Sequence, residues 1–505
     1  MARPIMIQGT MSNAGKSILA GGLCRVFKQD GYRAAPFKSQ NMALNSYITK
    51  EGLEMGRAQV MQAEAAGIMP TVAMNPILLK PTNDTGSQVI LNGEVKGVMS
   101  AAEYYRHKKD YIPVIMQAYE TLDKQFDIIV LEGAGSPAEI NLKESDIVNM
   151  GMAQMVDAPV LLAGDIDRGG VFAQIVGTIE LLEKEERARV KGIIINKFRG
   201  DKEILRPGLE MLENKIHIPV CGVVPYFYLD IDDEDSLSER LERKTNSGLA
   251  DVAVIRLPRV SNFTDTMPLE TIEELNVYYV SSPEKFGNPD AVMIPGSKNT
   301  MEDLLWLRQS GLEAKILRHA AAGKTVFGIC GGYQMMGEEI CDPQHVEAGG
   351  TIRGMGLLPI RTVFAGEKTR TQVAGTFCKM EGIWREMEGA SMKGYEIHMG
   401  VTECTRETSR IVRIEEETGN GKLKYDGAQN GNCLGCYIHG IFEEQTAALA
   451  FAKVLLKQKG YDPEKVKAVD WTAHKEEQYN KLADIIRENM DMDMIYRILG
   501  KGQQL

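Results

Sequence analysis

Gly9-Thr10-Met11-Ser12-Asn13-Ala14-Gly15-Lys16-Ser17 follows the apolar run 5–7 and precedes a helix-forming stretch at 17–27. A strand, a turn of small residues and a helix N-terminus bring backbone N–H groups around one point, as in phosphate sites. The stretch has five residues between Gly9 and Gly15, where the usual P-loop has four. A plain glycine-rich turn before a core helix explains the order strand, Gly-Lys-Ser, helix less well. We therefore expect a nucleotide site made by Gly9, Thr10, Ser12, Asn13, Ala14, Gly15, Lys16 and Ser17.

Length and composition indicate an ordinary globular protein of two or three domains, because 505 residues are too many for one core. A net charge of −11 argues against a nucleic-acid or acidic-membrane surface. No apolar run approaches the ~20 residues of a bilayer span, and the N-terminus lacks the pattern of a secretory signal. Eight cysteines are too sparse for a disulfide framework. We expect a cytoplasmic protein with reduced thiols and no membrane or nucleic-acid partner.

Strand-like and helix-like stretches alternate from residue 4 to about 225, which predicts a doubly wound parallel α/β sheet. Ligands bind such sheets at the carboxyl ends of the strands, and polar residues fall there. The expected strands are 5–7, 34–37, 128–131, 159–163, 192–195 and 219–224.

Three polar residues directly follow these strands. Lys38 can hold the charge of a transferring phosphoryl group, although a solvated lysine explains the spacing equally well. Glu132, before Gly133-Ala134-Gly135, is expected to bind Mg²⁺ together with Ser17. Asp165 lies in a glycine-bounded turn and is a further candidate for the metal, with an ordinary turn as the competing interpretation.

Asn196-Lys197 ends a later strand, at the place where many P-loop proteins contact the nucleotide base. The fuller Asn-Lys-x-Asp pattern of guanine binders is broken, because Arg199 stands where the Asp belongs. We therefore expect adenine, and hence ATP, to contact Asn196 and Lys197.

These motifs, with the stretch 31–38, resemble the dethiobiotin synthetase family. The resemblance implies an ATP- and Mg²⁺-dependent enzyme that converts a carboxylate into a mixed phosphate anhydride. It also implies that Lys38 assists at the phosphates, that Glu132 binds Mg²⁺ and that Asn196 contacts adenine. Two further stretches, 41–46 and 80–88, resemble the corrinoid-amidating branch of that superfamily.

The second half begins a new strand pattern at 252–255 and places Cys330 between Gly328 and Gly331-Gly332, on a strand-to-helix turn. This is a nucleophile elbow with sulfur as the nucleophile. The helix N-terminus favours the thiolate. The N–H of Gly331 and an N–H from the turn Gly296-Ser297 are candidate donors to an oxyanion. A buried structural cysteine explains this glycine pattern poorly.

His439, in Tyr437-Ile438-His439-Gly440, is the histidine we expect to serve Cys330 as a base, because it ends a late strand. With 328–334, this stretch resembles class I glutamine amidotransferases, which implies a flavodoxin-like α/β domain that releases ammonia from glutamine. Two residues beyond the histidine that family generally has Glu, and this chain has Ile441. The group that orients His439 is therefore open, with Glu443 and Glu444 as candidates; the corrinoid subgroup lacks the Glu as well.

Two other features are expected to carry no chemistry. Cys433 and Cys436 lie near His439, but without a second Cys-x-x-Cys pair a closed zinc site is not expected. The apolar stripe near helical spacing after residue 446 is expected to pack against a sheet.

The expected organisation is a synthetase domain at 1–228, a charged linker at 229–250, an amidotransferase domain at 251–445 and a helical tail at 446–505. The resemblance implies a glutamine-dependent enzyme of cobalamin biosynthesis that amidates the b, d, e and g carboxylates of an a,c-diamide corrinoid. The first alternative is the sister enzyme that makes the a,c-diamide. The stretches 41–46 and 80–88 favour the enzyme that starts from the a,c-diamide over this sister enzyme. The second alternative is a MinD-like ATPase switch with an inactive amidotransferase module. Such switches usually have a lysine early in the P-loop, and this chain has Met11 there, which argues against this alternative. A homo-oligomer is compatible with either.

Overall fold

The computed structural model describes residues 1–82, 86–231, 248–416 and 423–500, which form two compact units. Unit 1 holds Met1–Met42, the chain from Met55 to the gap at 232–247, and the chain from Lys475 on. Unit 2 holds Ala43–Glu54 and the chain from that gap to His474. This grouping differs from the contiguous division expected above, because an early segment belongs to unit 2 and the last helices belong to unit 1. Most of the expected linker lies outside the described residues.

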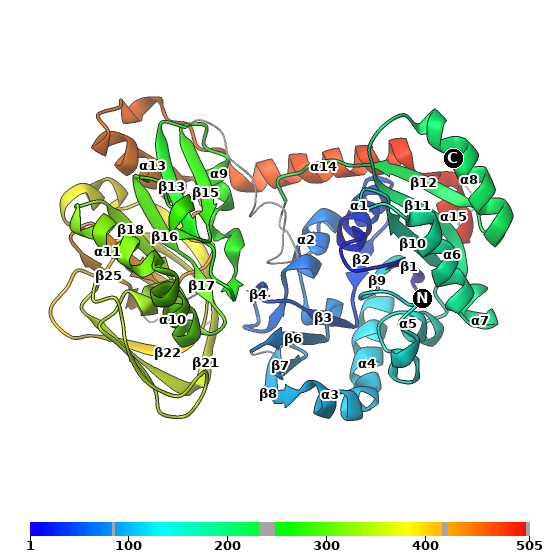
Figure 1. Ribbon diagram of the computed structural model, residues 1–505, viewed down its shortest axis with the longest axis horizontal. Helices are drawn as coiled ribbons and strands as arrows, with labels where there is room; N and C mark the ends of the chain where they lie inside the picture. Colours follow the sequence, from blue (N-terminus) through cyan, green and yellow to red (C-terminus); the bar gives the residue numbers. More distant parts are fainter. Residues whose placement is uncertain (83–85, 232–247, 417–422, 501–505) are drawn as a thin grey trace. The chain divides into compact units, whose positions relative to one another are not determined.

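Unit 1 is built on a six-stranded sheet in which all paired neighbours are parallel (Figure 1). The order is β12-β11-β10-β1-β9-β2, so the strand before the glycine-rich loop is central. The expected doubly wound parallel sheet is confirmed. The strands are β1 (Arg3–Gly9), β2 (Ala34–Phe37), β9 (Ile128–Glu132), β10 (Val160–Asp165), β11 (Val190–Phe198) and β12 (Val220–Pro225).

Helices lie on both faces of this sheet, as the alternating pattern requires. The apolar stripe of α14 (Trp471–Asn489) packs against α1 (Lys16–Gln29), and Leu482 and Ile486 approach Gly22. The stripe thus packs on a helix, and Met490 directly after α14 also pairs with Gly222 of β12, in the sheet. The other helices of unit 1 are α2 (Arg57–Ala66), α3 (Ala101–His107), α4 (Ile112–Asp123), α5 (Met150–Met155), α6 (Val171–Leu181), α7 (Lys184–Arg187), α8 (Lys202–Ile216) and α15 (Met492–Ile498).

A smaller four-stranded sheet with the order β3-β6-β7-β8 also belongs to unit 1. It carries parts of the two stretches that resemble the corrinoid-amidating branch; residues 83–85 lie outside the described residues. Its strands are β3 (Gln40–Met42), β6 (Ile77–Pro81), β7 (Gly86–Leu91) and β8 (Glu94–Ser100).

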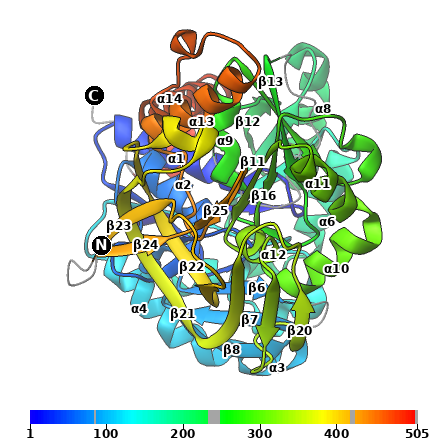
Figure 2. The same ribbon diagram turned by 90° about the vertical axis from the view of Figure 1, so that its left-hand side faces the viewer.

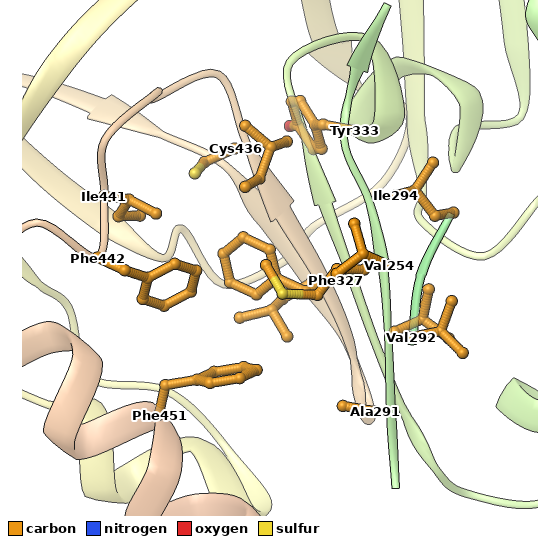
Figure 3. Packing of buried hydrophobic residues seen from close by; sticks show 14 of the residues in the cluster. Val254, Ala291, Val292, Ile294, Phe327, Tyr333, Cys436, Ile441, Phe442 and Phe451 are labelled. Carbon is orange, nitrogen blue, oxygen red and sulfur yellow. The ribbon is translucent and has the colours of Figure 1, made fainter. Parts of the chain in front are cut away.

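Unit 2 has a six-stranded sheet with the order β15-β13-β16-β18-β26-β25, parallel except for the pair β25 and β26. Figure 3 shows its apolar residues packing on Phe442 and Phe451 next to Phe327, whose ring is edge-on to that of Phe451. These strands are β13 (Ala250–Ile255), β15 (Leu275–Val280), β16 (Ala291–Ile294), β18 (Thr325–Ile329), β25 (Ala428–Asn430) and β26 (Cys433–Cys436).

A second sheet of unit 2 contains the long antiparallel pair β21 (Ile360–Phe377) and β22 (Ser391–Cys404), seen in Figure 2. Two short pairs, β4 with β5 and β14 with β17, complete the strands. The remaining strands are β4 (Ser46–Ile48), β5 (Glu54–Gly56), β14 (Val260–Ser261), β17 (Gly296–Ser297), β19 (Glu339–Asp342), β20 (Gly350–Arg353), β23 (Val412–Glu416) and β24 (Leu423–Asp426).

Five helices accompany these sheets: α9 (Met267–Glu270), α10 (Thr300–Ser310), α11 (Leu312–Ala321), α12 (Gly331–Met335) and α13 (Gln445–Gln458). Among the described residues, no helix combines the length and the apolar character needed to span a bilayer.

Candidate active site

The glycine-rich loop has the backbone of a phosphate-binding turn. Gly15 caps α1 with φ 88°, in the left-handed region that favours glycine, and Asn13 has φ 60°. A Cβ at Gly15 would overlap the side-chain amide of Asn196, so the position has no room for a larger residue. Lys16 Nζ donates to the carbonyls of Met11 (3.0 Å) and Gly135 (3.2 Å). The lysine is thus held over the mouth of the loop.

Glu132 lies at the centre of a buried polar cluster beside this loop. Glu132 is 2% exposed, and its carboxylate accepts hydrogen bonds from Ser17 Oγ (2.8 Å), Lys38 Nζ (2.7 Å) and Gln62 Nε2 (2.6 Å). A buried ion pair of this kind is stable only when its partners are fully hydrogen-bonded. The structure therefore brings together three of the predicted residues, Ser17, Lys38 and Glu132. A carboxylate beside a hydroxyl at a phosphate loop is a donor set that fits Mg²⁺.

Asp165 does not join that cluster. It ends β10, whereas Glu132 ends β9, and these strands flank β1 on opposite sides. The Asp165 carboxylate pairs with Lys197 Nζ at 3.0 Å and accepts the backbone N–H of Asp167 at 2.9 Å. This geometry favours a role for Asp165 in fixing Lys197 over the metal role that the sequence suggested.

Asn196 Nδ2 donates to the carbonyl of Ala14 at 2.8 Å, so the residue expected at the base also braces the phosphate loop. Nearby, the guanidinium of Arg199 stacks over the ring of Tyr226 at 3.5 Å. Asn196 thus lies beside the phosphate loop, and its contact with a nucleotide base stays a prediction.

Cys330 stands between β18 and α12 with φ 51° and ψ −108°, a strained conformation for a residue with a side chain. A Cβ at Gly332 would overlap the carbonyl of Ile294, and a Cβ at Gly331 would lie 2.8 Å from the backbone nitrogen of Ser297. Only glycines allow this close approach. The three expected oxyanion residues, Gly331, Gly296 and Ser297, thus meet beside the sulfur, and whether their N–H groups hold an oxyanion stays a prediction.

His439 is oriented by Asp265. Its Nδ1 donates to Asp265 Oδ2 at 2.7 Å, and the N–H of Gly440 donates to Asp265 Oδ1 at 2.8 Å. Both side chains are buried, at 1% and 2% exposure. Burial lowers the pKa of His439, but the charges of Asp265 and Cys330 outweigh burial and raise the pKa to about 10. The imidazole is therefore protonated at neutral pH, next to the Cys330 side chain.

Asp265 is the residue that the sequence analysis missed. Glu444 pairs with Lys393 at 3.1 Å, and the acceptor for His439 Nδ1 is Asp265 and neither Glu443 nor Glu444. Asp265 lies 174 residues before the histidine, in the 3-10 turn Phe263–Thr266. No periodicity or motif marks this turn, so no local signal could have identified it.

Cys433 and Cys436 are strand residues of β26, and all eight cysteines are free thiols. Within the described ranges, no three His, Cys, Asp or Glu side chains are grouped to hold a metal ion. The structure thus adds nothing in favour of zinc.

A nucleophile elbow with a histidine–carboxylate pair, on the same chain as a phosphate loop, defines a glutamine amidotransferase joined to a nucleotide-binding domain. Residues 251–447 match the model of the CobB/CobQ-like glutamine amidotransferase domain. Residues 5–235 match the model of the CobQ/CobB/MinD/ParA nucleotide binding domain. The expected class is confirmed for both halves of the chain.

Three relatives specify the family. The chain is 59% identical to cobyric acid synthase of Ruminiclostridium cellulolyticum, over 99% of this chain and 98% of that protein. Identity is 56% to cobyric acid synthase of Lachnoclostridium phytofermentans (99% and 100% covered) and 53% to that of Clostridium acetobutylicum (98% of each). The chain belongs to the cobyric acid synthase family.

Proposed function

We propose that this chain uses ATP and glutamine to amidate the b, d, e and g carboxylates of adenosylcobyrinic acid a,c-diamide, giving adenosylcobyric acid. The observation that carries the proposal is the Cys330, His439 and Asp265 arrangement on one chain with the Glu132 cluster. Similarity along nearly the whole chain to cobyric acid synthases supports the corrinoid substrate. Eight free thiols support a cytoplasmic location.

In unit 2, the Cys330 thiolate attacks the side-chain carbonyl carbon of glutamine. The oxyanion is held by N–H groups at Gly331 and at the turn Gly296-Ser297. Protonated His439 gives its proton to the nitrogen that leaves as ammonia, and a thioester remains. Neutral His439 then takes a proton from the water that cleaves the thioester, and Asp265 stabilises the imidazolium formed.

In unit 1, a carboxylate oxygen of the corrinoid attacks the γ-phosphorus of ATP, and ADP leaves. The loop amides and Lys16 hold the phosphates, while Lys38 neutralises charge on the transferring group. Mg²⁺, bound through Ser17 and Glu132, would screen the phosphate charges when present. Ammonia then attacks the acyl carbon, and the phosphate departs and takes up the proton that the nitrogen loses, which leaves the amide.

Two other functions explain fewer of these observations. The sister a,c-diamide synthase has both domain types. The relatives named above, however, are cobyric acid synthases, and the similarity extends over nearly their full length. A switch ATPase with an inactive module does not require a nucleophile held beside a histidine–aspartate pair.

The test is to measure glutamate release and corrinoid products by mass with each nitrogen donor. Wild type should add four amides with glutamine or with ammonia. Cys330→Ser should lose glutamine-dependent product and keep ammonia-dependent product. If Cys330→Ser still releases glutamate, the assigned nucleophile is wrong; if only two amides are added to cobyrinic acid, the sister activity is correct.

A further inference from the structure

The segment Ala43–Glu54 belongs to unit 2, although the preceding β3 and the following α2 belong to unit 1. It precedes the matched amidotransferase domain at 251–447 and lies outside it. Two of its residues, Asn45 and Ser46, are 1% and 0% exposed. A polar pair this deeply buried needs specific partners.

The first partner is Asn262. Its backbone N–H donates to Asn45 Oδ1 at 2.8 Å, and its own Oδ1 accepts the N–H of Ser46 at 3.0 Å. Asn262 has φ 52° and begins the turn Phe263–Thr266, which carries Asp265. The reciprocal hydrogen bonds therefore fix the residue from which that turn starts.

The second partner is Tyr395, on the other side of the histidine. Its hydroxyl donates to the carbonyl of Ser46 at 3.1 Å. Its ring stacks on His439 with a centroid distance of 5.5 Å and an interplanar angle of 26°. Backbone hydrogen bonds run both ways between Tyr395 and His439, at 3.0 and 2.9 Å. Asp265 is thus connected to Asn45-Ser46 through Asn262, and His439 is connected to Ser46 through Tyr395.

We propose that Asn45 is a positioning residue for glutamine hydrolysis. It acts through Asn262 by holding Asp265 against His439 Nδ1, and so fixes the orientation of the imidazole. The amidotransferase centre is then incomplete without a segment from the first tenth of the chain. This inference rests on the proposed role of Cys330 and His439 in hydrolysis.

The test uses the full chain with Asn45→Ala, which removes the acceptor for the Asn262 N–H, and with Asn262→Gly. Glycine keeps the left-handed conformation and removes only the acceptor for Ser46. Each variant should lower kcat for glutamate release by about 10-fold with little change in KM for glutamine, as for other residues that orient a reacting group. The dependence of the rate of Cys330 alkylation by iodoacetamide on pH should differ from that of wild type in both.

Thr49→Ala is the matched control. Thr49 is buried in the same segment and accepts the N–H of Leu53 at 3.4 Å, but none of the described hydrogen bonds joins it to Asn262 or Tyr395. It should keep the wild-type pH profile. Equal effects of Thr49→Ala and Asn45→Ala, or an unchanged profile in Asn45→Ala, would overturn the inference. The wild type and Cys330→Ser, assayed in parallel, report on the proposed function itself, so the two failures are distinguishable.

Discussion

At the scale of single residues, the chemistry of unit 2 depends on one carboxylate. Asp265 is the described group that bonds His439 Nδ1, and burial by itself lowers the pKa of that imidazole. Without the negative charge of Asp265, the largest influence that raises the pKa of the buried ring is lost, and burial lowers that pKa. The carboxylate therefore sets both the tautomer and the charge of the base.

Replacing Asp265 by Asn should lower the pKa of His439 and decrease kcat for glutamate release by about 100-fold or more. Glutamate assays from pH 6 to 10 measure the rate, and alkylation of Cys330 measures the thiolate. Glu443→Gln is the control and should retain wild-type activity. If the Glu443 variant shows the large loss and Asp265→Asn does not, the assignment of Asp265 is wrong.

The His439–Asp265 pair also predicts how the free energy of unfolding depends on pH. The pKa of His439 in the folded unit is raised from 6.5 to about 10, so the folded state binds this proton more tightly than the unfolded state. Its contribution is complete below pH 6.5 and is lost as the pH rises through about 10. Denaturant midpoints of wild type and His439→Gln should therefore converge at alkaline pH; a constant gap would contradict the shift.

In unit 1 the corresponding residue is Glu132. Glu132→Gln keeps the shape but removes the charge that pairs with Lys38 at 2.7 Å, so a buried ammonium loses its counter-ion. ATP-dependent amidation should fall by about 100-fold, measured as ADP released with corrinoid and ammonia present. The exposed Glu139→Gln should behave as wild type. Full activity of Glu132→Gln would exclude the proposed metal and lysine roles.

At the scale of elements, the contact between α1 and α14 is close enough to test by adding one methyl group. A Cβ at Gly22 would lie 2.6 Å from Ile486 Cγ1, so Gly22→Ala should destabilise unit 1 by about 1–3 kcal/mol through overpacking. A Cβ at Gly177, in α6, would meet no atom within 4 Å, so Gly177→Ala should be neutral or stabilise by up to about 1 kcal/mol. Urea unfolding, followed with and without ATP, distinguishes the two; equal effects would contradict the packing argument.

At the scale of the whole molecule, the order of the chain does not follow the two units. The last helices complete the core of unit 1, where Tyr479, Leu482 and Ile486 are at most 1% exposed. Burying each such side chain contributes about 1.5–3 kcal/mol. The sum over the three is comparable to the whole stability of a domain. A chain ending at His474 should therefore lose ATP binding even though the matched nucleotide-binding domain ends at 235.

That truncation is best checked beside point variants of α14. Ile486→Ala should destabilise unit 1 by about 2–5 kcal/mol, and the exposed Asp484→Ala should change it by less than about 0.5 kcal/mol. ATP binding by calorimetry and urea midpoints give the measurements. A truncated chain that binds ATP as tightly as wild type would show that α14 is dispensable for unit 1.

The sequence by itself determined the features that depend on residues close together in the chain. The phosphate loop, the alternating strands of both sheets, Lys38, Glu132, Cys330 and His439 each lie within a few residues of the turn or strand end that identifies them. Hydrophobic periodicity and glycine spacing are properties of neighbouring residues, so they can be read without coordinates.

Only the tertiary structure decided which distant residues share a site. It brought Asp265 to His439, paired Asp165 with Lys197, and placed 43–54 with unit 2 and most of α14, from Lys475 on, with unit 1. These contacts join residues far apart in the chain, and a single carboxylate or asparagine carries no periodic signal of its partner. The physical reason is that a buried hydrogen bond is selected by three-dimensional proximity and desolvation, which arise only when the whole chain packs.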